Sequence, residues 1–534
     1  MRRRAWQLIG LREAFLGMIL ASLPRLWGLG TFMTIDEPTW MKRSQVFAMA
    51  ILNRDWKRTD VSRHPGVTLA WLGAGSMAPK ILWEYADQEH GNKMGLDEFV
   101  KRYDPAEFCL PTQVAVALSC IVCCFLFILL LSRLTRPCIG GYFGVFIALE
   151  PVLVGYSKVF HMDMLMTSFM GLSFLCVLLY LKENRLFWCA WVGVFGALAT
   201  LTKISSFFSI FPLPLVCIWK AYKNRSVQHE ARALMLCGGV WILLVALCWP
   251  AFLFHPLETL KRLLSGVDYG LTTIHGADSF FMGKRIPVVG PSYIWIGLLC
   301  VTSPLTLMTA FVGLERCLAF LRNRKEPWTS EAINILLFVA MAFAFTMMMM
   351  IGAKRAVRYN LIMILAWHGL SAFAVVWWMD MRWIKSPGLL NLITRFFLIC
   401  AAGLLVLQVI WWNPHEISYV TPLIMGRELE RDVLLRGWGE GLEMAARYLN
   451  TKPKADSLIV ATWYDGSFSP FFRGTTKNLG YAFDLDTDYV VLYANQVQRG
   501  KHPEVVAQYW DTMPEYIAKI KGREMAWVYK ARPG

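Results

Sequence analysis

Charged residues are scarce in this sequence. Asp, Glu, Lys and Arg make up 17% of its 534 residues, whereas soluble globular domains carry about 25%. Hydrophobic residues reach 56%, and the mean hydropathy is +0.43. This composition excludes an ordinary soluble domain and predicts a protein that crosses a membrane many times. The net charge of +16 does not indicate nucleic acid, because basic cytoplasmic loops are the usual source of such an excess in an inner-membrane protein.

Two further features are missing. No small-residue cleavage site follows the first apolar run, so this run is predicted to remain as a membrane anchor. No His/Cys spacing matches a structural zinc site, and no cysteine follows Cys400. Cys120 and Cys123 have redox spacing, but they lie in an apolar run, where cysteine packs as a small hydrophobe. We expect no cofactor and no metal, although several acids and histidines could offer ligands to a divalent ion: Asp36, Glu37, His64, His161 and Asp163.

Apolar runs long enough to cross a bilayer are abundant. About eleven such helices are predicted by the length needed to cross ~30 Å of hydrocarbon, near residues 11–31, 111–131, 138–157, 164–181, 186–202, 204–221, 233–254, 291–313, 332–352, 359–379 and 391–412. With the N-terminus in the cytoplasm, nearly every inner turn is basic: Arg133/Arg136, Lys182/Arg185, Lys220/Lys223/Arg225/Arg232, Arg316/Arg322/Arg324/Lys325 and Arg382/Lys385. This orientation puts the C-terminus outside.

Two regions lie outside the predicted spans. Residues 32–110 form a long first outer loop, in which residues 67–83 are predicted to lie along the membrane interface. Residues 413–534 lose the membrane composition. In this second region we expect helices at 441–450 and 504–520 and strands at 458–461 and 489–493, which together predict a small α/β domain on the outer face.

Polar residues converge on one face of the predicted bundle. Asp36 and Glu37 directly follow the first span, although a charge left in lipid costs several kcal/mol. The predicted orientation places many other ionisable or polar residues on the same outer face: Arg63, His64, Lys158, His161, Asp163, Lys203, His255, His275, Lys354, Arg355, Arg358 and Tyr359. A random scatter would divide such residues between both faces, so this convergence indicates a site.

The order of these motifs resembles the GT-C glycosyltransferases, in particular the branch of protein O-mannosyltransferases and aminoarabinose transferases. The acidic pair Asp36-Glu37, then His64-Pro65-Gly66, then Asp163 at the outer end of the third span carry the resemblance. Further motifs resemble a bacterial subgroup of the family: Trp412-Asn413-Pro414-His415, Gly437-Trp438-Gly439-Glu440-Gly441 and Asp488-Tyr489-Val490-Val491. The resemblance implies an all-α transmembrane catalytic domain of the GT-C fold at residues 1–412 and an extracytoplasmic α/β domain at 413–534.

The resemblance also implies a function. Such an enzyme transfers a sugar from a polyprenyl-phosphate donor to a hydroxyl of an acceptor lipid, glycan or protein, at the outer face of the bacterial cytoplasmic membrane. Asp36 resembles the general base of an inverting displacement, with Glu37 and Asp163 as supporting catalytic residues. Arg355, Arg358 and, more weakly, Lys203 are candidates for the donor phosphate, since guanidinium binds phosphate bidentately. The remaining pocket candidates are His64, His161, His275 and Tyr359.

Each role has a structural alternative. Asp36 could cap an interfacial helix, Asp163 could pair with Lys158, and His64 could be a turn residue. Arg355 and Arg358 could anchor to lipid head groups, and Glu440 has no assigned role. For the whole chain, the alternative function is a transporter or a lipid-linked sugar flippase, although no internal repeat is present; a membrane assembly factor is a third possibility.

Overall fold

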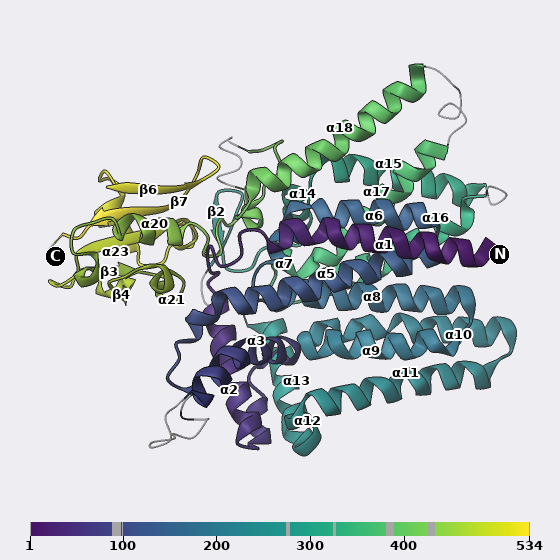
Figure 1. The fold of residues 1–534 in the computed structure, drawn as a ribbon, viewed down its shortest axis with the longest axis horizontal. Helices are drawn as coiled ribbons and strands as arrows, with labels where there is room; N and C mark the ends of the chain where they lie inside the picture. The colour runs from purple at the N-terminus through teal and green to yellow at the C-terminus, as the bar shows by residue number, and fades with distance from the viewer. Residues whose placement is uncertain are drawn as a thin grey trace.

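The computed structural model describes residues 2–87, 98, 100–273, 278–323, 327–380, 389–425 and 433–532. A bundle of helices runs lengthwise through the molecule, and the chain ends in a sheet region beyond one end of this bundle (Figure 1). We call that end of the bundle the sheet-side end. The N-terminus lies at the opposite end (Figure 1). Arg324, Lys325, Arg382 and Lys385, which support the predicted orientation, lie outside the described residues.

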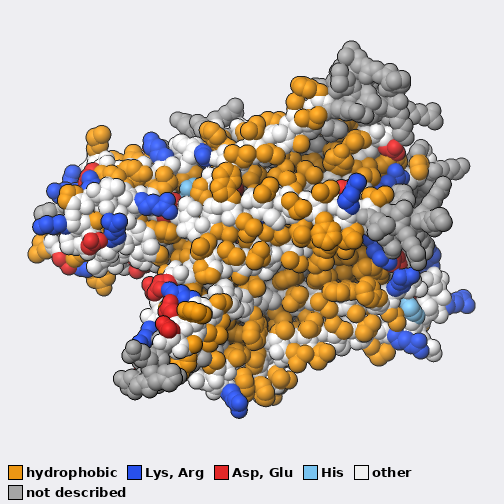
Figure 2. Space-filling view, in the orientation of Figure 1, with side chains coloured by type: hydrophobic (Ala, Val, Ile, Leu, Met, Phe, Trp, Pro, Cys, Tyr) orange, Lys and Arg blue, Asp and Glu red, His pale blue; other side chains and the backbone are white. Residues whose placement is uncertain are grey.

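The bundle is built from apolar helices. They are α1 (Arg2–Leu26), α5 (Cys109–Leu134), α6 (Pro137–Leu149), α7 (Pro151–Ser157), α8 (Met162–Glu183), α9 (Leu186–Thr202), α10 (Pro212–Asn224), α11 (Val227–Cys248), α14 (Ser292–Val301), α15 (Pro304–Arg322), α16 (Thr329–Met349), α17 (Leu361–Asp380) and α18 (Leu389–Trp412). Hydrophobic side chains cover the visible face of the bundle, and charged side chains gather towards its two ends (Figure 2). An apolar surface of this kind suits the hydrocarbon core of a membrane.

Seven helices in the described part of the chain are long and apolar enough to cross a membrane, or eight if the bent pair α6–α7 counts as one span. The multi-span helical class is therefore confirmed, with fewer full-length spans than predicted. α9 and α14 are apolar but shorter, and α1, which contains Arg12, Glu13 and Arg25, is not among the candidates.

Two predicted spans are broken in the structure. The segment 138–157 bends by 68° between α6 and α7, and 291–313 is wrong as one helix because α14 ends at Val301 and α15 begins at Pro304. Each second helix begins with a proline, which lacks an N–H and cannot continue a preceding helix. The two breaks meet, since buried Glu150 accepts hydrogen bonds from the Ser303 N–H and the Thr306 hydroxyl, both at 2.8 Å.

Shorter elements lie at the sheet-side end. The first long loop contains α2 (Glu37–Leu52), η1 (Trp56–Thr59), α3 (Val67–Ala86) and η2 (Pro105–Phe108), and α3 is not among the candidate spans. α12 (Pro250–Phe254) leads into α13 (Pro256–Thr272), which buries Thr259 and Gly266 and exposes Leu257 and Leu264. Strands β1 (Ser279–Phe281) and β2 (Lys284–Ile286) form an antiparallel hairpin. Short helices η3 (Ile204–Ile210), η4 (Val357–Asn360) and η5 (Glu416–Ser418) connect the larger elements.

The C-terminal region contains a five-stranded sheet in the order β4-β3-β5-β7-β6. Its strands are β3 (Ile459–Thr462), β4 (Thr475–Asn478), β5 (Tyr489–Tyr493), β6 (Tyr516–Ile520) and β7 (Arg523–Lys530). β3 runs parallel to β4 and β5, while β7 is antiparallel to β5 and β6. Helix α20 (Leu442–Leu449) packs in a cluster with Val491, and α23 (Pro503–Trp510) packs in another with Val490. Successive residues of β5 face opposite sides of the sheet, so helices cover both faces and the predicted α/β class is confirmed.

One predicted helix in this region is wrong. The segment 504–520 is helical only as far as Trp510, and residues 516–520 form strand β6. Pro514 lies between the two elements and cannot continue the helix. Pairing with β7 then satisfies the backbone groups of β6 that face that strand.

A buried ion pair joins the bundle to the C-terminal region. Lys158, which follows α7, has its Nζ 3.0 and 2.8 Å from the two carboxylate oxygens of Glu416 in η5. Gly155 lies against the same turn, since a Cβ there would meet the Ile417 nitrogen at 2.4 Å. Lys158 therefore pairs with Glu416, and the alternative pairing of Asp163 with Lys158 is wrong.

Candidate active site

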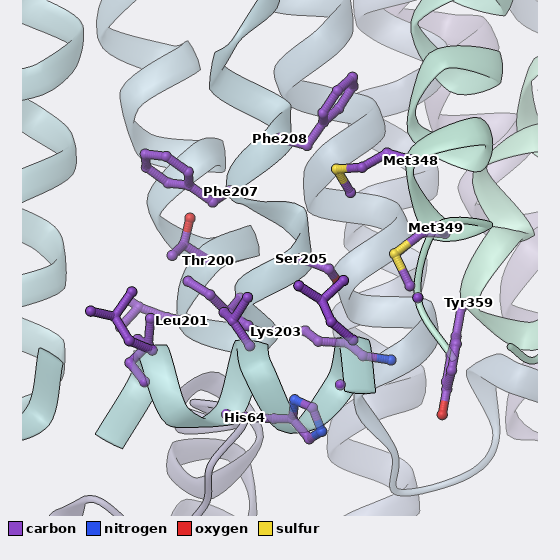
Figure 3. Close-up of a pocket in the computed structure, with 18 of the residues that line it drawn as sticks. His64, Thr200, Leu201, Lys203, Ser205, Phe207, Phe208, Met348, Met349 and Tyr359 are labelled. Atoms are coloured by element: carbon purple, nitrogen blue, oxygen red, sulfur yellow. The ribbon is translucent and has the colours of Figure 1, made fainter. Parts of the chain in front are cut away.

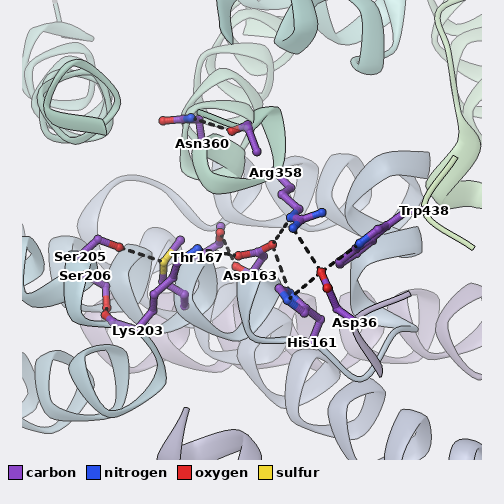
Figure 4. A network of polar contacts seen from close by, with 12 residues as sticks. Asp36, His161, Asp163, Thr167, Lys203, Ser205, Ser206, Arg358, Asn360 and Trp438 are labelled. Carbon is purple, nitrogen blue, oxygen red and sulfur yellow. Dashed lines mark hydrogen bonds and ion pairs between the residues drawn. The ribbon is translucent and has the colours of Figure 1, made fainter. Parts of the chain in front are cut away.

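Asp36 lies at the sheet-side end of the bundle, directly before α2. It occupies the N-cap position, but its side chain makes no capping hydrogen bond. Instead its Oδ2 accepts hydrogen bonds from Arg358 Nη2 at 3.2 Å and from the indole nitrogen of Trp438 at 3.0 Å (Figure 4). Among the residues that the structure describes, no hydrogen bond or ion pair uses Oδ1. The carboxylate is 38% exposed, so one oxygen is held in place and the other can meet a ligand.

Asp163 lies in the first turn of α8 and is fully buried. Its Oδ1 is 3.1 Å from Lys203 Nζ, and its Oδ2 is 3.2 Å from Arg358 Nε (Figure 4). His161 adds a contact of 3.2 Å to Asp163 and one of 3.8 Å to Asp36. We call the chain of contacts Lys203–Asp163–Arg358–Asp36 the ionic network. It brings together four residues from four distant segments of the chain. The sequence predicted that all four lie on one face of the bundle.

Glu37 points into the protein core. It is fully buried and accepts hydrogen bonds from the main-chain N–H groups of Thr34 (2.5 Å) and Phe160 (2.7 Å) and from the Gln113 amide (3.0 Å). Burial raises the pKa of Glu37 above its usual value, and these hydrogen bonds oppose that rise. Glu37 therefore ties the loop that carries Asp36 to the segment that carries His161.

An apolar cavity of about 570 Å³ opens on one side of the ionic network. Its walls include Phe207, Phe208 and Met349, and its polar end carries a histidine, two lysines and a tyrosine: His64, Lys203, Lys354 and Tyr359 (Figure 3). Lys203 Nζ lies 3.6 Å from the centre of the Tyr359 ring. An apolar chamber with cations at one end fits a ligand that has a long hydrocarbon tail and an anionic head.

His64 is neutral at the end of this cavity. Burial, and to a smaller extent the nearby charges of Lys203 and Lys354, lower the pKa of His64 to about 4. At neutral pH the imidazole therefore offers a hydrogen bond and no charge. The positive charge at this end of the apolar cavity comes from the two lysines.

A second cavity, of about 320 Å³, lies between the bundle and the C-terminal region. Asp36 and Trp438 are part of its wall, together with five arginines: Arg355, Arg358, Arg436, Arg499 and Arg523. We call it the arginine-lined cavity. Lys203 lines the apolar cavity and Asp36 the arginine-lined cavity, so the ionic network separates two chambers of different character. The three residues predicted to bind the donor phosphate are divided between the two cavities. Lys203 lines the apolar cavity, whereas Arg355 and Arg358 line the arginine-lined cavity.

Trp438 is a site residue that the sequence reading missed. It belongs to the loop 437–441, whose main chain pairs with the Asp36 loop through a 2.9 Å hydrogen bond from the Ile35 N–H to the Trp438 carbonyl. Gly439 has φ +120°, and a Cβ there would lie 2.5 Å from the Met33 oxygen, so the contact requires glycine. The glycine-rich loop could be recognised in the sequence, but Asp36, which accepts the hydrogen bond from Trp438, lies 402 residues away.

The sheet holds this loop in place. The Tyr493 hydroxyl at the end of β5 accepts a hydrogen bond from the Gly439 N–H at 2.8 Å and donates one to the Glu440 carbonyl at 3.0 Å. Glu440 is buried and accepts from the Trp438 N–H (2.7 Å) and the Ser418 hydroxyl (2.6 Å). Glu440, for which no role was predicted, thus shapes the loop that presents Trp438.

If Asp36 is the general base that the sequence resemblance implies, Trp438→Phe should lower kcat about tenfold, because it removes a hydrogen bond to a charged oxygen, worth ~1.5–3 kcal/mol, and leaves the aromatic packing. The KM for the donor is expected to stay unchanged, since Trp438 does not line the apolar cavity. Trp510→Phe, at a 38% exposed position of the same region, is the matched control. Equal kcat in the two variants would show that the indole N–H does not position Asp36.

His275 lies outside the described residues. Within the described ranges, no group of three His, Cys, Asp or Glu residues is arranged so that it could hold a metal ion. His161 and Asp163 instead contact the cations and Asp36 of the ionic network.

Comparisons with known proteins agree with this architecture. Residues 109–249 match the family model of dolichyl-phosphate-mannose-protein mannosyltransferases. No curated protein matches the chain by sequence. Among solved structures, the apo oligosaccharyltransferase of Archaeoglobus fulgidus shares 12% identity over 92% of this chain and 72% of its own, with a TM-score of 0.50.

ArnT from Cupriavidus metallidurans, solved with undecaprenyl phosphate, is a further similar structure. It shares 13% identity over 96% of this chain and 97% of its own, with a TM-score of 0.49. The protein has the GT-C fold, and the family match is confined to residues 109–249.

Proposed function

We propose that the protein transfers a sugar from a polyprenyl-phosphate donor to an acceptor hydroxyl, with Asp36 as the general base. The observation that carries this proposal is the position of the ionic network between two chambers. One chamber is apolar and ends at Lys203, while the other exposes the Asp36 carboxylate. A donor and an acceptor can thus approach one set of charges from opposite sides.

The apolar cavity is the donor site in this proposal. The polyprenyl chain lies along its aromatic and aliphatic walls, and its phosphate lies near Lys203, Lys354 and Tyr359 at the polar end. Lysine binds phosphate as a point charge, and Asp163 sets the position of Lys203 through their 3.1 Å contact. The matched family supports this type of donor, since its members are described as using dolichyl phosphate mannose.

The chemistry is a single displacement. Asp36 takes the proton of the acceptor hydroxyl, the acceptor oxygen forms a bond to the anomeric carbon, and the bond from that carbon to the phosphate oxygen breaks. The phosphate keeps the electron pair and leaves as polyprenyl phosphate, with its charge stabilised by Lys203 and Lys354. Attack from the side opposite the leaving group inverts the anomeric configuration.

The site faces the outside of a bacterial cytoplasmic membrane in this proposal. Basic residues in turns at the end of the bundle away from the sheet, such as Arg133 and Lys182, support an inner position for that end. The sheet-side end, with both cavities, is then extracytoplasmic. The acceptor comes from the cell envelope.

Donor binding can be tested with undecaprenyl phosphate and the full-length protein in nanodiscs. We expect Lys203→Met to weaken this binding by tenfold or more, because a hydrogen bond to a charged group is worth ~1.5–3 kcal/mol. Lys223→Met is the control, since Lys223 is an exposed residue at the end of α10. Equal affinity in both variants would argue against the apolar cavity as the donor site. Uphill or vectorial lipid movement without sugar transfer would favour a flippase.

A further inference from the structure

Within the described chain, three basic side chains near the polar end of the apolar cavity have no acidic partner. Arg43 lies over the Trp40 ring, 4.6 Å from its centre. Arg63 and Lys354 lie over the Tyr269 ring, 4.9 and 3.3 Å from its centre. None of the three side chains donates a hydrogen bond or forms an ion pair among the described residues. An aromatic ring attracts a cation but does not neutralise it, so these charges remain available to a ligand.

Other basic residues at the sheet-side end are paired with acids. Lys57 Nζ is 2.7 Å from Glu258 Oε1, and Arg262 Nη1 is 3.3 Å from Asp60 Oδ2. Both pairs join the first long loop to α13. Among the described residues, the lack of an acidic partner is therefore a property of the side chains beside the cavity and not of the whole surface.

Arg43 stands close to both the proposed base and the cavity. Its aromatic support, Trp40, lies one helical turn after Asp36 and donates from its main-chain N–H to the Asp36 carbonyl at 3.2 Å. A Cβ at Gly66 would lie 2.4 Å from the Trp40 ring, so this ring also touches the turn that follows His64. The charge of Arg43 lowers the pKa of His64. Burial lowers the pKa of Arg43 itself, and the charge of Asp36 only opposes this shift.

Arg63 reaches the same place from the other side of the His64 turn. A Cβ at Gly266 in α13 would lie 2.4 Å from the Arg63 carbonyl oxygen, so the turn and α13 are in contact. Lys354 and His64 line the apolar cavity, whereas Arg43 and Arg63 do not. The two arginines therefore stand beyond its polar end. A donor whose tail fills the cavity and whose phosphate lies near Lys354 would hold its sugar there.

The charge balance of the site indicates what kind of sugar this is. The ionic network pairs two cations with two carboxylates, so its own charges cancel. The phosphodiester of a polyprenyl-phosphate sugar carries one negative charge, which Lys354 balances. Arg43 and Arg63 then still lack an anion. The reaction does not supply one, because the leaving phosphate gains a negative charge while the proton removes the charge of Asp36.

We propose that the donated sugar is acidic, as in a hexuronic acid, and that Arg43 and Arg63 bind its carboxylate. Guanidinium binds a carboxylate through two parallel hydrogen bonds and keeps its charge at all physiological pH values. A neutral sugar would leave both guanidinium groups without an anion, so the site discriminates against it. The inference rests on the proposed function, because it takes the donor phosphate to lie near Lys354.

The test measures ligand binding to the full-length protein in nanodiscs of phosphatidylcholine. Glucuronic acid 1-phosphate and galacturonic acid 1-phosphate stand in for the head of an acidic donor, with glucose 1-phosphate and galactose 1-phosphate as their neutral counterparts. The test variant is Arg43→Gln/Arg63→Gln, and Arg63→Gln alone changes only an exposed position. The control is Arg54→Gln/Arg58→Gln, which removes two exposed arginines of the same long loop.

We expect the wild type to bind at least one acidic ligand about tenfold or more tightly than its neutral counterpart, since a charge-assisted pair is lost with the neutral sugar. The double variant should lose this preference, Arg63→Gln should reduce it, and the control should keep it. Unchanged binding of undecaprenyl phosphate would show that the double variant is folded. If it does not fold, Arg63→Gln decides, because an unchanged preference in that variant overturns the proposal.

Other outcomes would also overturn the proposal. One is equal binding of each acidic ligand and its neutral counterpart by the wild type, and another is a preference that survives in the double variant. Undecaprenyl diphosphate that binds more tightly than undecaprenyl phosphate, with a dependence on Arg43 and Arg63, would assign the two arginines to a second phosphate instead.

The same preparations separate this inference from the proposed function. Undecaprenyl phosphate binding that falls in Lys203→Met and is unchanged in the double variant, together with the expected preference, supports both assignments. Undecaprenyl phosphate binding that falls in the double variant would make Arg43 and Arg63 ligands of the donor phosphate and overturn the inference. If Lys203→Met leaves undecaprenyl phosphate binding unchanged while the preference for acidic sugars depends on the two arginines, the donor assignment fails and the acidic-sugar site stands.

Discussion

An Asp36→Asn protein is expected to transfer sugar about 10²- to 10⁴-fold more slowly than the wild type, which is the range for loss of a general base. Asparagine keeps an oxygen that can accept from Trp438 and Arg358, so the loop should keep its shape. Arg358 also keeps its contact with Asp163 at 3.2 Å. The loss should therefore appear in the chemical step, measured by single-turnover transfer from a saturating polyprenyl-phosphate sugar.

Two comparisons make this result decisive. Asp465→Asn, an exposed acid near α2, should transfer sugar at the wild-type rate. Undecaprenyl phosphate should bind Asp36→Asn as tightly as the wild type, because Asp36 does not line the apolar cavity. Transfer by Asp36→Asn within a factor of three of the wild type would remove Asp36 from the role of base.

Glu416→Gln is expected to lower the stability of the protein by ~3–5 kcal/mol, the cost of leaving a buried charge without its partner. Lys158 is 2% exposed and Glu416 is fully buried, so water cannot replace the lost carboxylate. The measurement is the free energy of unfolding of the detergent-solubilised protein, followed by tryptophan fluorescence.

The double variant Lys158→Met/Glu416→Leu distinguishes the effect of an unpaired buried charge from the effect of disturbed packing around the Lys158–Glu416 contact. Removing both charges leaves none unpaired, and such replacements are often neutral. We therefore expect the double variant to be more stable than Glu416→Gln alone. A double variant as unstable as the single one would show that the loss comes from packing around η5, where the Asn413 amide also donates to Glu416 at 3.0 Å.

Hydropathy predicted the helical bundle well and its breaks poorly. Hydrophobicity summed over a window finds an apolar run but changes little with one proline inside it. Pro151 and Pro304 were therefore not recognised as the starts of separate helices. The two breaks meet at Glu150, whose carboxylate bridges two segments 153 residues apart. No local pattern encodes that contact. The strand 516–520 was missed for a related reason, since its pairing with β7 decides its conformation.

For the site, too, the sequence predicted the general placement of the residues but not their contacts. Membrane orientation predicted that Asp36, Asp163, Lys203 and Arg358 share one face, because each lies near the outer end of a predicted span. Which cation contacts which acid depends on tertiary packing, and the pairing of Lys158 with Glu416 could not be read from spacing. Trp438 was missed because its loop resembles a surface turn until the Asp36 loop is placed against it.

The dependence of Asp36 on the loop 437–441 has a consequence for biosynthesis. The chain is made from its N-terminus, so the bundle residues that hold Asp36 and Asp163 exist before the sheet that anchors the loop through Tyr493. Domains form in the order in which they are synthesised. A nascent chain already inserted in the membrane therefore lacks the indole that orients the Asp36 carboxylate until the loop 437–441 and the sheet have been made.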